Sequence, residues 1–317
     1  MRTSGWNLVE VLSFLARRVL GMIPIVFGAS LIVFIVGHLA PGDPVQILFG
    51  DISDPIIEAR ARASLGLDKP LAVQYLRFLD RLAHLDLGTS YAYPGMRIGR
   101  MIGAALPVSL ELAIMAVLVA VAVGVPLGAV AALRRHSLLD RAVRFITVLG
   151  IAVPFFVIAV ILVLVFSLRL RWLPVSGWGT PRDLVLPIVI QMLRPMAYLA
   201  RITRLSLLQV LGEDYIRTAR AKGLPTRLVT FRHALRNAAV TILTTAGLTL
   251  SLAFTGAFVT ETIFGIPGMG RATVTAIFQR DYPMIQAVVL VYTGLILTLN
   301  LMMDLAYAVV DPRIRYA

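Results

Sequence analysis

The sequence contains no cysteine and little charge for its length. Without cysteine there are no disulfides, no thiolate metal ligands and no cysteine nucleophile. Charged residues make up 15% of the 317 residues, whereas 58% are hydrophobic, and the mean hydropathy is +0.85. A soluble domain of this length buries its core with fewer apolar residues, so the excess indicates a protein with lipid as its solvent.

The sequence also lacks the common motifs of catalysis and nucleotide binding. It has no Gly-Lys dipeptide and therefore no P-loop, and neither a His-Glu-x-x-His nor a Gly-x-Ser-x-Gly constellation. Its four histidines are scattered and predict no metal site: His38, His84, His136 and His233. These absences disfavour an intramembrane hydrolase and predict a non-catalytic membrane protein.

The net charge of +13 has a simple source in a membrane protein. Short cytoplasmic loops carry an excess of arginine and lysine, and no basic soluble domain is visible, so nucleic acid is not expected as a partner. A proton-coupled secondary transporter stays open as a different class, because Glu111, Glu261 and Asp304 lie in or near apolar runs. The lack of an evident internal repeat counts against that class.

Apolar runs of about 20 residues, the length that crosses a bilayer, predict the membrane spans. Five of the six predicted spans have a strong apolar pattern. The remaining one, the fourth along the chain, has a weaker pattern because Pro187, Arg194 and Pro195 interrupt it. The prediction is an all-α polytopic membrane protein with six transmembrane helices and an external helical segment between spans 1 and 2. The spans are 19–39, 104–133, 145–168, 184–203, 238–260 and 284–308.

The positions of the arginines orient these spans. Basic residues flank the first span and gather in the second and fourth connections and at the C-terminus, so that face is predicted to be cytoplasmic. The cytoplasmic parts are then 1–18, 134–144, 204–237 and 309–317, and the external parts are 40–103, 169–183 and 261–283. Within the first external part, two amphipathic helices are expected, one ending at Gly66 and one following Pro70.

A basic stretch between two spans, Glu213 to Asn237, predicts two helices separated by Gly223. Glu213 lies four residues before Arg217, which suits a pair on the helix surface. Pro225 suits the first turn of the second helix, whose apolar face would carry Leu228, Phe231 and Leu235. Two interpretations remain open: a loop resting on anionic lipid headgroups, or a docking element for a cytoplasmic partner.

This stretch resembles the cytoplasmic "EAA" loop of ABC-importer permeases, in particular the dipeptide/oligopeptide/nickel group. Gly223 and Ala219 match the motif. The general motif has glutamate, alanine, isoleucine and proline where this chain has Arg217, Thr218, His233 and Arg236. Other blocks similar to the group follow in order along the whole chain: "HLAPGDPV" (38–45), "LGLDKPLAVQY" (65–75), "DLGTS" (86–90), "SLELAIMA" (109–116), "ETIFGIPGMGR" (261–271), "RDYP" (280–283) and "VDPRIRY" (310–316).

The resemblance implies a type I ABC importer permease fold, with its transmembrane domain at about residues 105–308. It implies a second, similar permease, two ATPase subunits on the cytoplasmic loops, and an external substrate-binding protein. ATP and Mg²⁺ would be bound by the ATPases, so that this chain holds no cofactor. The cargo would be a dipeptide or oligopeptide moved by alternating access, with nickel chelates and glutathione as alternatives within the group.

The candidate functional residues fall into three sets. The ATPase-coupling loop is assigned Arg217, Thr218, Ala219, Gly223, Pro225, Leu228, Phe231 and His233. Arg194 is expected to face protein or water rather than lipid, either in the translocation cavity or in an ion pair with a partner carboxylate. Glu261, Gly268, Arg271 and Asp281 belong to an external gate or to a cap over the helix ends, and the sequence leaves both readings open. Glu261 is expected near the water, paired with Arg271 or Arg280.

Overall fold

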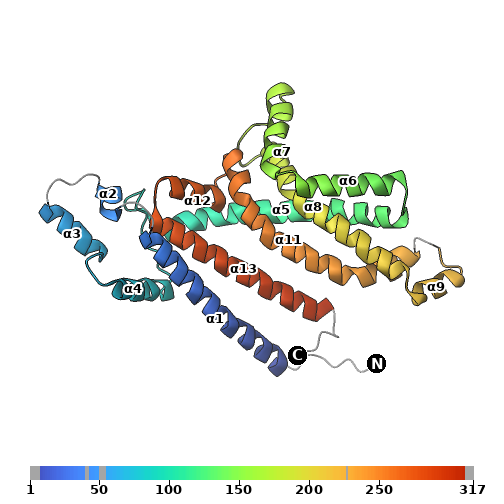
Figure 1. Cartoon of the computed structure of the whole chain (residues 1–317), viewed down its shortest axis with the longest axis horizontal. Coiled ribbons are helices and arrows are strands. Elements are labelled where there is room, and N and C mark those ends of the chain that lie inside the picture. The colour runs from blue at the N-terminus through green and yellow to red at the C-terminus, as the bar shows by residue number, and fades with distance from the viewer. Residues whose placement is uncertain (1–7, 40–42, 50–54, 226–227, 311–317) are drawn as a thin grey trace. The chain divides into compact units, whose positions relative to one another are not determined.

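The computed structural model describes residues 8–39, 43–49, 55–225 and 228–310, and its elements are helices (Figure 1). The described residues contain no β-sheet, and one isolated bridge pairs Thr89 with Arg97. The elements are α1 (Leu8–Leu39), α2 (Pro44–Phe49), α3 (Pro55–Leu65), α4 (Leu71–Ala83), α5 (Ile98–Leu133), α6 (Leu138–Ala152), α7 (Phe155–Leu162), η1 (Val163–Arg169), α8 (Pro181–Leu211), α9 (Asp214–Ala221), η2 (Val229–Ala234), α11 (Leu235–Ile263), α12 (Met269–Phe278) and α13 (Tyr282–Val310).

Contacts divide the chain into two compact units. The first combines the chain up to residue 104 with residues 272–301, and the second combines residues 105–271 with the chain from residue 302. Five described helices are long and apolar enough to cross a membrane, and one bent pair of helices passes the same test together. The five lie at Ala16–Leu39, Ile98–Leu133, Pro181–Leu211, Leu235–Phe254 and Tyr282–Leu305.

The third predicted span, 145–168, is not one helix. The chain bends by 102° between α6, which ends at Ala152, and the pair α7 and η1, which begins at Phe155. Val153 has extended backbone angles, φ −81° and ψ 127°, because the ring of Pro154 disfavours the helical conformation in the residue before it. The apolar pattern is the same on both sides of this break, which is why hydropathy alone predicted a continuous span.

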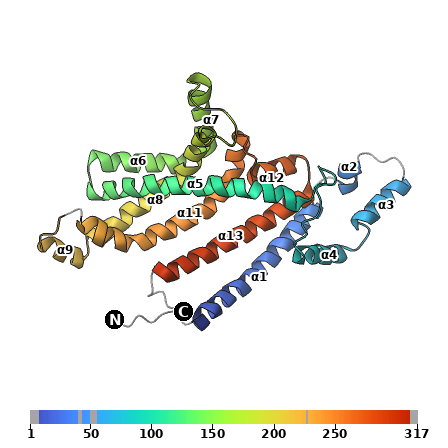
Figure 2. The same ribbon diagram turned by 180° about the vertical axis from the view of Figure 1, so that it is seen from behind.

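In the second unit, α5 crosses α8 closely at two glycines. A Cβ atom added at Gly124 would lie 2.7 Å from the carbonyl oxygen of Met196, and one at Gly128 would collide with the carbonyl oxygen of Ala200. Glycines four residues apart let two helix backbones approach, which is how helices pack where lipid supplies no hydrophobic driving force. α8 also packs along α11 and α6 (Figure 2).

A buried ion pair strengthens the contact between α6 and α8. Asp140, with no exposed surface, accepts hydrogen bonds from Nε and Nη2 of Arg204 at 2.6 and 3.0 Å. Such two-point geometry fixes the direction as well as the distance between the two helices. Asp140 also accepts the backbone N–H of His136 at 3.1 Å, so the turn before α6 is held by the same carboxylate.

In the first unit, α1 and α13 run side by side in both views (Figures 1 and 2). Gly37 makes this possible, because a Cβ atom there would collide with the side chain of Gln286. α4 lies against α1 through an aromatic cluster, in which the Phe34 ring is 5.1 Å from Tyr75 and 5.8 Å from Phe78. The two helices predicted between the first two spans are therefore present, and Gly66 ends α3 with φ +70°.

The close crossing of α5 and α8 can be tested with a matched pair of variants. Gly128→Ala should lower the free energy of unfolding by about 1–3 kcal/mol, because the new methyl group overpacks the contact with Ala200. Gly103→Ala, in the same helix with open space around it, should be neutral or stabilising, because alanine restricts the unfolded chain. Thermal unfolding in detergent measures both, and equal midpoints for the two variants would contradict the close crossing.

Candidate functional site

The segment that follows α8 forms the short basic helix α9 and ends at Gly223. Glu213 occupies the N-cap position, and Gly223 adopts φ +75°, the left-handed conformation that stops a helix. Ile216 and Ala219 are buried, three residues apart on the inner face of α9. They belong to one hydrophobic cluster with Leu199 and Leu207 of α8, so α9 is packed onto the second unit's core.

The outer face of α9 is basic. Arg217, Thr218 and Arg220 are exposed, and Tyr215 is 43% exposed. Arg217 pairs with Asp214 at 3.3 Å and not with Glu213 as predicted, because Glu213 sits at the cap position outside the first turn. Asn237 donates a hydrogen bond to the Tyr215 hydroxyl at 2.7 Å, which ties the outer face of α9 to α11.

The second helix of this stretch is not a separate element. After Pro225 and the 37% exposed Leu228, the chain forms η2 and continues directly into α11. α8 extends to Leu211, so the connection between the long helices is shorter than the predicted loop 204–237. Phe231 and His233 lie in η2, and their side chains fall outside the part of the chain that is described.

Arg194 lies on the exposed face of α8, although the residue after it, Pro195, is buried. No described residue forms an ion pair with Arg194. Arg201 follows seven residues later on the same face, is also exposed, and likewise forms no ion pair with a described residue. Sequence reasoning did not select Arg201, because it lies at the polar end of the predicted span.

Glu261, at the end of α11, is fully buried and accepts hydrogen bonds from two directions. Oε1 accepts the hydroxyl of Ser109 at 2.6 Å, and Oε2 accepts the backbone N–H of Arg271 at 3.0 Å. The Ser109 oxygen in turn accepts the backbone N–H of Met269 at 2.8 Å. The carboxylate thus binds free N–H groups at the start of α12, where a negative charge is favoured.

The predicted surroundings of Glu261 were therefore wrong. The carboxylate is not near water, and Arg271 offers its backbone N–H while its guanidinium donates to the carbonyl of Gly265 at 2.5 Å. Position 268 needs glycine for a steric reason, because a Cβ atom there would collide with the carboxylate of Glu261. The partner that the sequence could not reveal is Ser109, which lies 152 residues away.

Asp281 plays the same part in the first unit. Its buried carboxylate accepts the Ser90 hydroxyl, the backbone N–H of Tyr91 at 3.1 Å and that of Met284 at 3.4 Å. It therefore caps the start of α13 and fastens the loop that contains the "DLGTS" block to that helix end. Burial raises the pKa of the Tyr91 phenol beside it.

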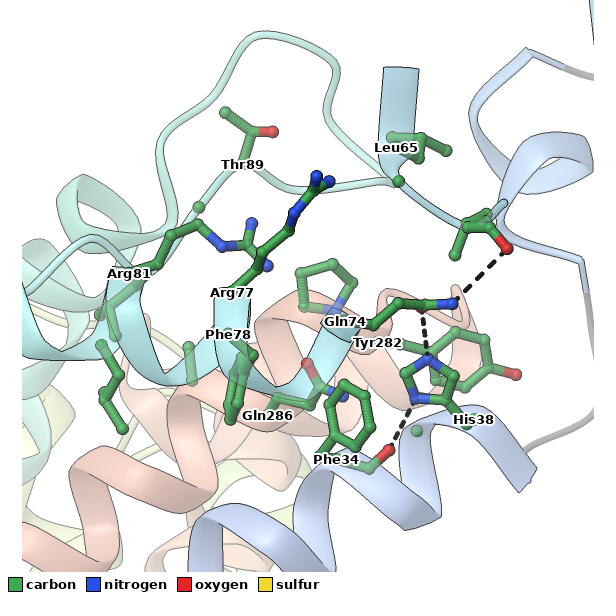
Figure 3. Close-up of a pocket in the computed structure, with 18 of the residues that line it drawn as sticks. Phe34, His38, Leu65, Gln74, Arg77, Phe78, Arg81, Thr89, Tyr282 and Gln286 are labelled. Carbon is green, nitrogen blue, oxygen red and sulfur yellow. Dashed lines mark hydrogen bonds between the residues drawn. The ribbon is translucent and has the colours of Figure 1, made fainter. Parts of the chain in front are cut away.

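A pocket of about 760 Å³ lies in the first unit, lined by residues of α1, α3, α4, α13 and the loops before and after α4 (Figure 3). His38 and Gln74 join two of its walls, with His38 Nε2 and Gln74 Oε1 3.0 Å apart. Gln74 Nε2 donates to the carbonyl of Lys69 at 2.8 Å, which fixes the amide orientation. The sequence pattern gave no sign of this pocket, because its residues come from three stretches that lie far apart in the chain.

The buried carboxylate of Glu261 yields a prediction. In Glu261→Gln an amide NH₂ replaces one acceptor oxygen, so a donor must face either Ser109 or the N–H of Arg271. The loss should be about 1–3 kcal/mol of unfolding free energy, the cost of a buried unpaired donor. Glu111→Gln, at an exposed position of α5, is the control and should leave the unfolding midpoint unchanged. Similar midpoints for the two variants would contradict the role of Glu261.

Comparison with known proteins identifies the family of this chain. Residues 124–316 match the family described as binding-protein-dependent transport system inner membrane component, and residues 11–95 match the N-terminal part described for such components. A probable peptide ABC transporter permease protein of Sinorhizobium fredii is 38% identical over 96% of this chain and 99% of its own length. A di/tripeptide transport system permease protein of Pseudomonas aeruginosa is 39% identical over the same shares of the two chains.

An oligopeptide transport system permease protein of Salmonella typhimurium is 39% identical over 96% of this chain and all of its own length. Among solved structures, the inward-facing MetNI methionine ABC transporter aligns with a TM-score of 0.59 and 16% identity. That alignment covers 67% of this chain and 96% of the other, and at this identity it concerns the fold alone. The fold and the near full-length similarity agree: this chain belongs to the family of binding-protein-dependent transport system inner membrane components.

Proposed function

We propose that this chain is the permease subunit of an ATP-driven importer that moves peptides across the cytoplasmic membrane by alternating access. The observation that carries the proposal is the near full-length similarity to permease proteins whose names specify peptides, di/tripeptides and oligopeptides. The complex would contain a second, homologous permease, two ATPase subunits and an external binding protein. ATP and Mg²⁺ would be bound by the ATPase subunits, so this chain would supply the path and the coupling.

The coupling segment, α9 with Gly223, is the proposed docking site for an ATPase subunit. Two features support it: its inner face is anchored in the hydrophobic core through Ile216 and Ala219, and its outer face presents Arg217 and Arg220. An element that touches a partner on one side and the core on the other can pass a displacement to the spans. A loop resting passively on lipid headgroups would not need the anchored inner face.

Charge reversal tests the docking site. The double variant Arg217→Glu/Arg220→Glu should reduce recovery of the ATPase subunits with the permease by about tenfold or more, because both charges on the outer face of α9 change sign. Arg141→Glu, at an exposed position of α6, is the matched control and should keep normal recovery. Co-purification from membranes measures both, and equal ATPase recovery in the two would remove α9 from the interface.

The proposed topology puts both termini and the coupling segment in the cytoplasm. Because the chain has no cysteine, single substitutions report their own side of the membrane. Asp68→Cys, exposed between α3 and α4, should react with a membrane-impermeant thiol reagent added outside intact cells. Lys222→Cys, at the end of α9, should react only after the membrane is opened. The reverse labelling pattern would overturn the orientation.

Arg194 is proposed to face the translocation path. It is exposed on α8, and a guanidinium turned toward lipid would cost about 3 kcal/mol, so it must meet water or protein in the assembled complex. A guanidinium in a peptide path can bind a terminal carboxylate at two points. The competing role is an ion pair with a carboxylate of the second permease.

The two roles of Arg194 predict different losses. In the path, Arg194→Gln should lower uptake of carboxylate-bearing peptide about tenfold while assembly and basal ATPase activity stay normal. In a subunit contact, assembly or thermal stability should fall first. Arg182→Gln, exposed at the start of α8, is the control for a lost charge on the same helix. Normal uptake by a stable Arg194→Gln complex would exclude the path role.

A further inference from the structure

The pocket in the first unit contains two arginines that form no ion pair with a described carboxylate, although the charge of Asp68 acts on one of them, Arg77, from a longer distance. Arg77 and Arg81 are four residues apart on α4 and therefore on one face of the helix, and both are exposed. Figure 3 shows both side chains extending from α4 into the space below the loop that carries Thr89. Two like charges so placed repel each other, and an anion between them removes that repulsion.

The other charged groups in and around the pocket are already engaged. Arg62 pairs with Glu58 at 2.9 Å and with Asp43, while Asp68 pairs with Lys69 at 3.0 Å. Asp86 accepts the backbone N–H of Gly88 at 3.1 Å. Asp80 lies 3.7 Å from Nδ1 of His84 and does not pair with either arginine of α4. Among the described residues, Arg77 and Arg81 are thus the lining arginines with no carboxylate at ion-pair distance, although the carboxylates of Asp80 and Asp86 also belong to the lining.

Two glycine turns lie next to these guanidinium groups. An added Cβ atom at Gly66 would lie 3.0 Å from Nη1 of Arg77, and one at Gly88 would lie 3.7 Å from Nη1 of Arg81. Both glycines have positive φ, +70° and +79°, so a side chain there is disfavoured and the space is kept for the arginines. Each guanidinium group therefore lies beside one of two turns that border the cavity.

The rest of the lining suits an apolar body. Phe34 and Phe78 lie on the wall below the arginines, and Leu65 lies at the opposite side (Figure 3). A volume of about 760 Å³ falls within the range of small-molecule sites, which combine apolar walls with a few placed polar groups. A ligand with one anionic group and one apolar part would use both kinds of surface.

We propose that this pocket binds the oxyanion, carboxylate or phosphate, of a small amphipathic molecule, with Arg77 and Arg81 as its ligands and the aromatic wall around its apolar part. Arginine is suited to both groups, because its planar fork matches carboxylate and phosphate oxygens at two points. Two sources carry this chemistry: the C-terminus of a short peptide and the headgroup of an anionic phospholipid. The site shares no residue with the coupling segment or with Arg194; its peptide source rests on the proposed function, whereas its lipid source does not.

The peptide arm uses the assembled transporter in phosphatidylcholine nanodiscs, without the binding protein. Equilibrium dialysis with radiolabelled Ala-Phe should show binding that Ala-Phe amide does not share. Arg77→Gln/Arg81→Gln should weaken this binding by about tenfold or more, the typical effect of losing charged hydrogen bonds. Arg60→Gln, exposed on α3 outside the pocket, should bind normally. The same loss should appear in an Arg194→Gln background, which separates this pocket from the translocation path.

The lipid arm uses native mass spectrometry of the complex in nanodiscs containing phosphatidylglycerol. Retention of that lipid, lost in Arg77→Gln/Arg81→Gln and kept in Arg60→Gln, would assign the oxyanion to a headgroup, whereas arginine-dependent Ala-Phe binding assigns it to a peptide. Either result supports the site. Equal binding of Ala-Phe and its amide, together with lipid retention that does not depend on the two arginines, would overturn it.

Discussion

The structure depends on one constraint: a backbone N–H or C=O group buried away from water must find its partner inside the protein. Long helices meet this requirement along their length, but their first turns leave N–H groups free. In this chain two buried carboxylates fill that need, Glu261 at the start of α12 and Asp281 at the start of α13. Each also binds a serine hydroxyl from a distant segment, so satisfying a helix end simultaneously fixes the fold around it.

The same requirement explains how closely the helices approach one another. Where lipid competes equally for apolar surface, helices associate through short-range packing, and small residues permit it. Gly124 and Gly128 bring α5 against α8, and Gly37 brings α1 against α13 through Gln286. The hydrophobic cluster at the crossing of α5 and α8 also includes Ile216 and Ala219 of α9. A displacement of the coupling segment is therefore resisted by the same packed core that positions α8, which makes the segment a mechanical part of the second unit.

Much of this could be predicted from the sequence, because apolar length and glycine positions act locally. The long helices, the stop at Gly223 and the helices α3 and α4 follow from such local patterns. The bend at Pro154 was missed because the apolar pattern is the same on both sides of it, and hydropathy carries no information on the direction of a helix. The partners of Glu261 and Asp281 were missed because they lie 152 and 191 residues away, a pairing that no local pattern encodes. The pocket that contains Arg77 and Arg81 was missed for the same reason, since only the tertiary fold brings its three stretches of sequence together.

The central claim is that this family member moves its cargo at the expense of ATP hydrolysed by partner subunits. The most direct measurement is uptake of a radiolabelled dipeptide into vesicles that contain the complete complex, with the binding protein added outside and ATP enclosed within. Uptake that requires enclosed ATP and persists when the proton gradient is collapsed is the result this account predicts. Uptake that continues without ATP and stops when the proton gradient is collapsed would contradict it.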